Sequence, residues 1–224
     1  MKLLFTPIVL LLLAGCSKIF RPYPCGPVLD KEGVQIFQKQ NEFLGLKQGM
    51  VFADLGASSG YYDAAMAVFL DSVTFYLNDI DHHCLNERNL NKVIRHYSKI
   101  RGNSLRESNT FHFVIGTPTH TKLPENTFDV IFSNATMHVI DYPDSILADL
   151  HRNLKADGNL YVRDEFAYDG KTKKCGSKKC GHELLQYDSF IKLMNRNGFK
   201  LTGESHDFGY PIYKFSKVTN PTAG

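Results

Sequence analysis

The sequence lacks a strong excess of charge of either sign. It contains 26 lysine and arginine residues against 23 aspartate and glutamate residues, which gives a formal net charge of +3. Surfaces that bind nucleic acid need clustered positive charge, and the lysines here are spread out except in the run at residues 171–179. We therefore expect no nucleic-acid partner.

Internal repeats and long low-complexity tracts are also missing. Apolar residues make up 43% of the chain and charged residues 22%, which is typical of a globular protein. A chain of 224 residues can form one domain with a full core and scarcely two.

No apolar run at the N-terminus is long enough for a permanent membrane span. Residues 3–13 are almost wholly apolar, follow Lys2 and precede Leu13-Ala14-Gly15-Cys16. This run is too short to cross a hydrocarbon layer of roughly 30 Å, but it has the length of a signal-peptide core. The four residues ending at Cys16 resemble the bacterial lipobox. The resemblance implies removal of residues 1–15, acylation of Cys16 and attachment to a membrane of the cell envelope. The alternative is an apolar N-terminal helix of a cytoplasmic protein, which the lack of helical periodicity disfavours.

Cysteine is scarce, and its use fits an exported protein. Five cysteines are present, and acylation of the first leaves four: Cys25, Cys84, Cys175 and Cys180. In an oxidising compartment the close spacing of the last two favours a local disulfide. A zinc site with His182 as third ligand and a pair of free thiols are the alternatives. No second pair with ligand spacing completes a tetrahedral set, so we expect no metal.

The chain divides into a short leader, a tether and one domain. Residues 16–29 are rich in proline and are expected to form a tether, followed by a domain at residues 30–218 and a tail at 219–224. Strands are expected at residues 50–55, 73–78, 110–116, 128–134, 159–165, 199–204 and 212–218. Helices are expected at residues 30–44, 60–70, 82–99, 143–154 and 188–195.

Alternation of apolar strands with helices predicts a doubly wound α/β fold with helices on both faces of a mostly parallel sheet of seven strands. The connection between the last two strands is too short for a right-handed crossover. The C-terminal strand should therefore run antiparallel to its neighbours.

Candidate ligand-binding residues lie where the first two strands end. The first strand runs into Asp54-Leu55-Gly56-Ala57-Ser58-Ser59-Gly60, where small residues allow a tight turn close to a ligand. The second strand ends at Asn78-Asp79-Ile80, which places a carboxylate where it could accept both hydroxyls of a ribose. This pairing alone also fits enzymes that use nicotinamide cofactors.

Three motifs together resemble the class I S-adenosylmethionine-dependent methyltransferases. The first is the bend at residues 54–60, the second is residues 123–134 (LPENTFDVIFSN) and the third is residues 150–158 (LHRNLKADG). They occur in the order and spacing of that family, and the similarity covers residues 30–218. The downstream motifs argue against a nicotinamide-dependent oxidoreductase.

The resemblance implies that S-adenosylmethionine is the cofactor and assigns roles to matching positions. Residues 56–60 would border the methionine part, with Asp54 orienting the bend. Asp79 would bind the ribose, Ile80 would lie against the adenine, and Asn134 would lie by the sulfonium. The implied cofactor-binding set is Asp54, Gly56, Ala57, Ser58, Gly60, Asp79, Ile80, Thr117 and Asn134.

Two positions depart from the family pattern. Ser58 replaces the usual middle glycine of the bend, and a serine is accommodated there if its φ is negative. Thr117 replaces an acid that contacts the adenine amino group, and a threonine hydroxyl can still accept that hydrogen bond.

Methyl transfer from a sulfonium is an in-line displacement, so much of the catalysis is positioning. A base is needed when the acceptor atom carries a proton. His138, which follows the fourth strand, is the first candidate, and Glu165 and His182 come next. The predicted acceptor is a small molecule, bound under the segment at residues 166–185.

The expected compartment raises a difficulty, because S-adenosylmethionine is made in the cytoplasm. Either the cofactor reaches the envelope, or the signal is misread and the domain is cytoplasmic. In the main alternative, the domain is a membrane-anchored, non-catalytic module that binds a nucleoside-like ligand.

Overall fold

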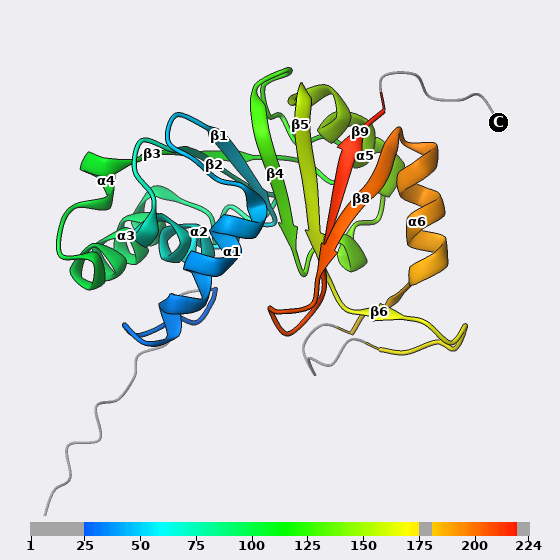
Figure 1. Cartoon of the computed structure of the whole chain (residues 1–224), viewed down its shortest axis with the longest axis horizontal. Helices are drawn as coiled ribbons and strands as arrows, with labels where there is room; N and C mark the ends of the chain where they lie inside the picture. Colours follow the sequence, from blue (N-terminus) through cyan, green and yellow to red (C-terminus); the bar gives the residue numbers. More distant parts are fainter. Residues whose placement is uncertain (1–24, 175–180, 219–224) are drawn as a thin grey trace, which may run out of the picture.

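A single twisted sheet of seven strands organises the molecule (Figure 1). The computed structural model describes residues 25–174 and 181–218. The sheet strands are β1 (Val51–Leu55), β2 (Thr74–Asp79), β3 (Thr110–Ile115), β4 (Phe128–Asn134), β5 (Leu154–Arg163), β8 (Phe199–Ser205) and β9 (Ile212–Lys217). Their order is β3-β2-β1-β4-β5-β9-β8. β9 pairs antiparallel with both β5 and β8, whereas the other pairs are parallel, so the predicted fold class is confirmed.

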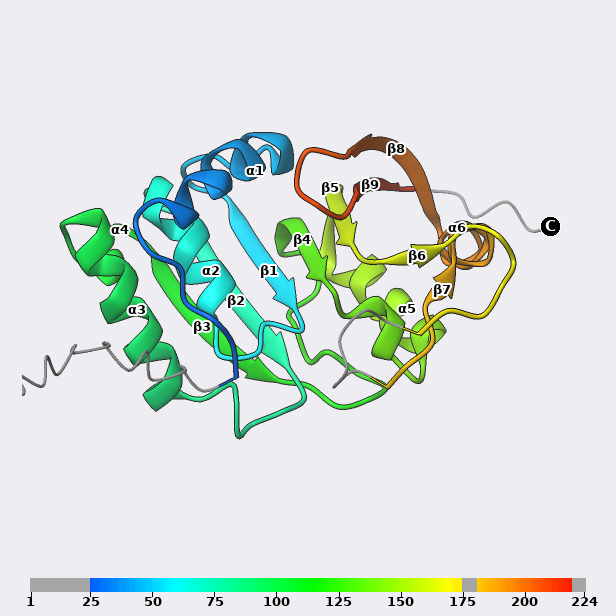
Figure 2. The same cartoon turned by 90° about the horizontal axis from the view of Figure 1, so that it is seen from below.

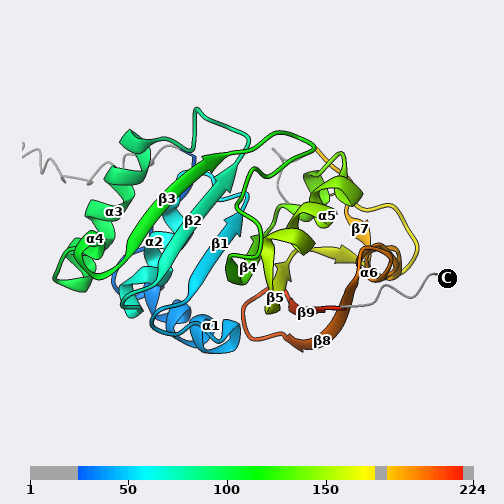
Figure 3. The same ribbon diagram turned by 90° about the horizontal axis from the view of Figure 1, so that it is seen from above.

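Helices cover both faces of the sheet (Figures 2 and 3). One face packs against α1 (Ile36–Leu44), α2 (Tyr61–Met66) and α3 (Glu87–Arg101), and the other packs against α5 (Pro143–Asn153) and α6 (Tyr187–Arg196). The remaining short helices are η1 (Gly33–Gln35), η2 (Ala67–Phe69), α4 (Leu105–Ser108) and η3 (Met137–Val139). Alternate residues of β1 show the two cores, because Phe52 joins the α1–α3 side and Ala53 the α5–α6 side.

The helix predicted at residues 82–99 begins later than expected, at Glu87. Asn86 is extended, with φ −155°, and its side chain accepts a hydrogen bond from the Asn89 N–H at 3.0 Å. This N-cap satisfies a donor that the first helical turn leaves open. The preceding residues form a turn in which the Cys84 N–H donates to the Asp81 carbonyl. The helix ends at Arg101, and Gly102 caps it in a left-handed conformation.

The fifth strand begins at Leu154 instead of residue 159 and ends at Arg163 instead of 165. Leu154 pairs with Phe128, and the register then shifts so that Asn159 pairs with Val130. A Cβ at Gly158 would lie 2.6 Å from the Phe128 carbonyl oxygen, so only glycine allows this close approach. Residues 157–158, which lie between the predicted helix and the predicted strand, therefore belong to an irregularity inside β5.

Residues 25–29 are not part of a free tether. Val28 is buried, and the Leu29 N–H donates to Tyr97 Oη at 2.9 Å. Cys25 forms a disulfide with Cys84 across 59 positions of sequence, a pairing that the sequence analysis did not propose. We call residues 25–29 the N-terminal strap. The predicted lipidation at Cys16 and the predicted Cys175–Cys180 disulfide lie outside the described residues.

The segment expected to form a loop over the site contains two short paired strands, β6 (Phe166–Ala167) and β7 (Leu185–Gln186). Phe166 packs on Phe190 and Tyr213, which fixes the start of this segment on α6 and β9. Within residues 25–174 and 181–218, no helix combines the length and apolarity needed to cross a bilayer.

Candidate active site

A cavity of about 220 Å³ lies at the carboxyl ends of the parallel strands. The chain passes from β1 outward to β2 and β3 and returns to β4 on the other side of β1, so the strand order reverses at β1. Ligands bind at such reversal points in open α/β sheets. The lining residues come from the ends of four strands and from α5: Leu55, Gly56, Asn78, Asp79, Ile80, Thr117, Pro118, Thr121, Thr136, Val139, Ile140, Asp141 and Ile146.

The bend after β1 requires glycine where it meets the segment after β4. Gly56 has φ +86°, and a Cβ there would lie 2.1 Å from Thr136 Oγ1. Any larger residue would push these segments apart and change the cavity wall, which both Gly56 and Thr136 line.

Ser58 has φ +53°, so the condition of a negative φ, under which a serine would be accommodated without strain, is not met. The backbone keeps the left-handed conformation that glycine would adopt. Two hydrogen bonds hold it there: the Ser58 N–H donates to Asp79 Oδ2 at 2.7 Å, and Ser58 Oγ donates to the Cys25 carbonyl at 2.5 Å. The strained residue thus joins the bend, the end of β2 and the N-terminal strap.

Asp79 is half-buried at the cavity wall with both carboxylate oxygens engaged by backbone N–H groups. Oδ2 accepts from Ser58 and Oδ1 accepts from Asp81 at 2.9 Å. Each oxygen has a further lone pair, so this geometry still allows hydrogen bonds from the two hydroxyls of a ribose.

Apolar and polar groups around the cavity suit a purine ring. Ile80 and Val139 both line the cavity and are 57% and 39% exposed, which is unusual for aliphatic side chains. Thr117 Oγ1 donates to the His120 carbonyl at 3.3 Å, which leaves its oxygen available as an acceptor. These groups can enclose a flat ring that carries an amino group.

A network of buried polar groups supports the floor of the cavity. The Asn78 amide donates to the carbonyls of Val114 and Thr121, at 3.1 and 2.8 Å. The Thr121 N–H in turn donates to buried Asp149 at 2.7 Å. The network holds the ends of β2 and β3 and the loop after β3 in fixed positions.

Several predicted cofactor residues lie near the cavity without lining it. Ala57 and Gly60 continue the bend, and Asn134 ends β4 beside Arg163 of β5. Asp54 is buried at the end of β1, where its carboxyl group meets that of Asp63 from α2. Burial raises the pKa of Asp63 to about 7 and also raises the pKa of Asp54, because neither charge is hydrated.

His138 is held by a buried carboxylate. Its Nδ1 lies 2.8 Å from Asp164 Oδ1, and its backbone N–H donates to Asp164 Oδ2 at 3.2 Å. The hydrogen bond with Asp164 raises the pKa of His138, although partial burial of the ring opposes the shift. The side chain is not part of the cavity lining, which includes its neighbours Thr136 and Val139.

Of the other two predicted catalytic residues, Glu165 lies next to the partner of His138, whereas His182 lies in a different segment. Glu165 directly follows Asp164, and its Oε2 accepts a hydrogen bond from Tyr210 Oη at 3.4 Å. His182 is exposed, ahead of β7. The structure therefore brings His138, Asp164 and Glu165 together at the ends of β4 and β5, beside the segment after β4 that lines the cavity.

The sequence analysis missed Val139, Ile140 and Asp141 as lining residues. Their only signal was their position directly after His138. It also missed the role of Asp164 as the partner of His138, which depends on contact between the ends of two neighbouring strands.

The residues present fit an adenosyl cofactor. Asp79 keeps acceptor capacity at the cavity wall, and Ile80 and Val139 present exposed aliphatic surface to the same cavity. The cavity is smaller than the roughly 300–1,000 Å³ typical of ligand pockets, so it would hold the nucleoside part, with the methionine part toward the bend.

Comparison with known proteins bears on the fold that carries this cavity. Residues 53–162 match a family model described as a methyltransferase domain. No curated protein sequence matches the chain. A methyltransferase from Aquifex aeolicus that depends on S-adenosylmethionine is 17% identical, with a TM-score of 0.60 over 85% of this chain and 100% of that one. A corresponding enzyme from Methanosarcina mazei is 13% identical, with a TM-score of 0.57 over 78% and 95%.

The cyclase SpnF has a similar fold, with 14% identity and a TM-score of 0.62 over 88% of this chain and 90% of that one. Likeness at this level of identity shows the fold alone. Residues 53–162 thus match a methyltransferase-domain model within a seven-stranded fold of the kind found in class I methyltransferases, and S-adenosylmethionine is the cofactor that the fold and the family match support.

Proposed function

We propose that this chain transfers the methyl group of S-adenosylmethionine to a small-molecule acceptor. One observation carries the proposal: Gly56, Asp79 and Thr117 come from the ends of three strands and line one cavity. When bound there, the cofactor supplies an electrophilic methyl group. Asp79 would hold the ribose, while Ile80 and Val139 would flank the adenine.

His138 would act as the base that takes up the proton lost by the acceptor atom. Asp164 accepts from Nδ1, which fixes the tautomer in which Nε2 is the basic nitrogen. Asp164 is itself buried and anchored by the Glu165 N–H at 2.8 Å, so the imidazole is oriented before the acceptor binds. Glu165 adds negative charge near the ring.

The first test is calorimetric titration of the chain with S-adenosylmethionine, S-adenosylhomocysteine and NAD. We expect heat with the first two and none with NAD. Asp79→Asn should weaken the binding of S-adenosylmethionine about tenfold, the effect of one hydrogen bond to a charged group. Asp81→Asn is the matched control, because Asp81 is two residues away and does not line the cavity.

The second test follows labelled methyl groups from the cofactor into low-mass compounds of an envelope extract. Transfer that depends on the chain and falls with His138→Ala at saturating cofactor supports the proposal. Binding without transfer would instead favour the non-catalytic module. Unchanged turnover of His138→Ala would remove this residue from the role of base.

We also propose that Cys16 carries a lipid anchor in the cell envelope. The Cys25–Cys84 disulfide supports export, because such bonds form mainly in oxidising compartments. Incorporation of labelled palmitate that is lost in Cys16→Ser is the expected result, and incorporation that survives this substitution would contradict it. An envelope location requires that the cofactor reach this compartment.

A further inference from the structure

Helix α3 concentrates positive charge, as the lysine run at residues 171–179 also does. It carries five lysine and arginine residues and one acidic residue, Glu87, within fifteen positions. The whole sequence has a net charge of only +3. A local excess of this size on one helix creates a field that a uniform distribution would not.

Four of these cations form a single stripe: Arg88, Lys92, Arg95 and Lys99. Successive helical residues turn by about 100°, so spacings of four, three and four place them within a sector of about 60°. Lys92 is half-buried and the other three are exposed. Among the residues that the structure describes, none of the four takes part in an ion pair. We call these residues the basic stripe.

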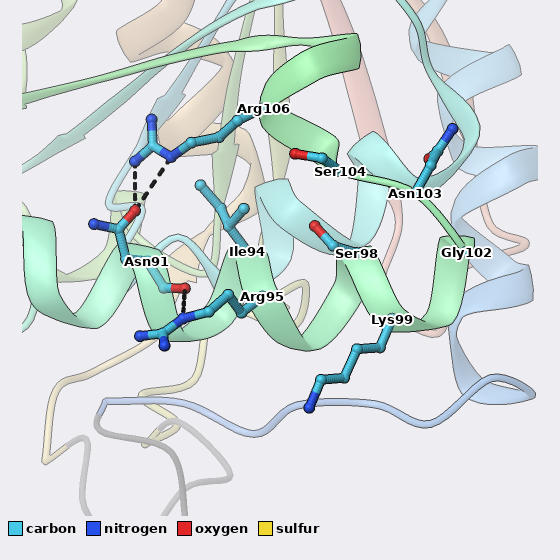
Figure 4. Close-up of a pocket in the computed structure, with 9 residues that line it drawn as sticks. All are labelled: Asn91, Ile94, Arg95, Ser98, Lys99, Gly102, Asn103, Ser104 and Arg106. Carbon is cyan, nitrogen blue, oxygen red and sulfur yellow. Dashed lines mark hydrogen bonds between the residues drawn. The ribbon is translucent and has the colours of Figure 1, made fainter.

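An open hollow of about 800 Å³ borders the stripe between α3 and α4. Figure 4 shows Arg95 and Lys99 extending from α3, and Arg106 of α4 reaching Asn91 at 2.7 Å. Arg106 is also 3.5 Å from Glu87, which partly neutralises it. The hollow thus places a fifth cation beside the stripe.

The N-terminal strap lies along the other edge of the stripe. The disulfide holds Cys25 beside Cys84, three positions before α3 begins, with 5.5 Å between their Cα atoms. Leu29 contacts Tyr97 and His96 further along the helix, at 2.9 and 2.8 Å. The chain therefore leaves the described domain at the amino end of α3.

The distance from the proposed anchor to this helix is limited. Cys16 is nine positions before Cys25, so even a fully extended chain spans about 30 Å at most between them. Helix α3 is itself about 22 Å long. A lipid on Cys16 would thus keep the whole basic stripe close to the membrane surface.

We propose that the basic stripe of α3 docks on the anionic headgroups of the membrane that holds the chain. The inference depends on the proposed acylation of Cys16 and goes beyond it, because it assigns an orientation to the domain. Opposite charge would attract the stripe to acidic lipid, and each basic residue near such a surface contributes about fivefold to partitioning.

Lysine footprinting of the acylated full chain tests the orientation. The chain is bound to vesicles of phosphatidylcholine, with or without phosphatidylglycerol, acetylated briefly and analysed by mass spectrometry. We expect acetylation of Lys92 and Lys99 to fall about fivefold on vesicles with phosphatidylglycerol. Lys192 on α6 and Lys200 on β8 are exposed internal controls and should be acetylated equally on both.

A variant with Arg88→Gln and Arg95→Gln keeps both reporter lysines while removing two charges of the stripe. It should lose most of the protection on phosphatidylglycerol vesicles, whereas the control Arg196→Gln on α6 should keep it. Equal acetylation of Lys92 and Lys99 on both vesicle types, in a chain that is acylated and floats with the vesicles, would overturn the docking surface alone. Absence of acylation at Cys16 would overturn the anchor and the inference with it.

Discussion

At the scale of single residues, two buried carboxyl groups meet beneath the bend after β1. Asp54 and Asp63 are 2% and 0% exposed, and their carboxyl groups lie close enough for one, when protonated, to donate to the other. Two ionised carboxylates cannot donate to each other, so the pair holds a proton near neutral pH. Asp54 Oδ1 and both oxygens of Asp63 have no other donor in hydrogen-bond geometry.

This pair should make the folded state less stable as pH rises. The pKa of Asp63 is raised to about 7 in the folded state from an ordinary value of 3.8. The folded state therefore binds the proton more tightly than the unfolded state, and stability falls between pH 4 and 7 and then levels off. Asp63→Asn should be more stable than the wild type at pH 8, by about 1–3 kcal/mol.

Urea unfolding at pH 5 and pH 8 measures the effect, with exposed Asp157→Asn as the control. The gain should be smaller at pH 5, where the wild-type pair is protonated. An equal gain at both pH values would mean that the proton is not shared in this way.

At Ser58, the effect of backbone strain on stability can be separated from the effect of the side-chain hydrogen bond. Ser58→Ala keeps the left-handed strain and loses the bond to the Cys25 carbonyl, so it should cost about 1 kcal/mol. Ser58→Gly relieves strain of about 1–2 kcal/mol. That gain is offset by the lost bond and by added chain entropy of about 0.5–1 kcal/mol. Thermal unfolding should therefore rank glycine near the wild type and alanine below it, and the reverse order would contradict the assigned conformation.

Asp164 is proposed as a positioning residue that acts through His138. Asn at this position can still accept from the imidazole, but it removes the charge that raises the pKa of His138. Since a base acts when deprotonated, activity should rise with pH, and Asp164→Asn should shift this rise to lower pH. The pH dependence of kcat/KM measures the shift, with Asp157→Asn as control. A lower rate without any shift would indicate a structural role alone.

At the scale of elements, the Cys25–Cys84 disulfide fixes the strap against the domain. Closing a loop of this length removes chain entropy worth about 4 kcal/mol from the unfolded state. The double variant Cys25→Ser, Cys84→Ser should therefore lower the free energy of unfolding by about 2–4 kcal/mol in urea. The comparison is the variant Cys175→Ser, Cys180→Ser, whose loop would be short. A larger loss in that second variant would contradict the stabilising role of the Cys25–Cys84 bond.

Strands and helices could be predicted from the sequence where the pattern of apolar residues fitted only one kind of element. β1 and β4 are mostly apolar, and their bounds agree with the prediction within a residue. The start of α3 was missed because the cap at Asn86 depends on a local side-chain bond. The start of β5 was missed because pairing of Leu154 with Phe128 depends on a neighbouring strand.

At the scale of the molecule, sequence reasoning located the cavity through residues at strand ends. Gly56 and Asp79 were found because a tight bend and a carboxylate follow recognisable strands. Val139 could not be found, because exposure of an aliphatic side chain is visible only in three dimensions. The Cys25–Cys84 pairing could not be found either, since 59 positions separate cysteines that only the packing of the strap on α3 brings together.

The place of β9 bears on when the molecule can fold. β9 (Ile212–Lys217) follows the other strands of this sheet along the chain, yet it lies between β5 and β8, and β8 has no other partner in the seven-stranded sheet. Two of the seven strands, β8 and β9, therefore stay out of the sheet until the ribosome has released residues 212–217. Under the proposed export, this delay would help the chain to stay unfolded during its passage through a secretion channel, because a completed sheet could not pass.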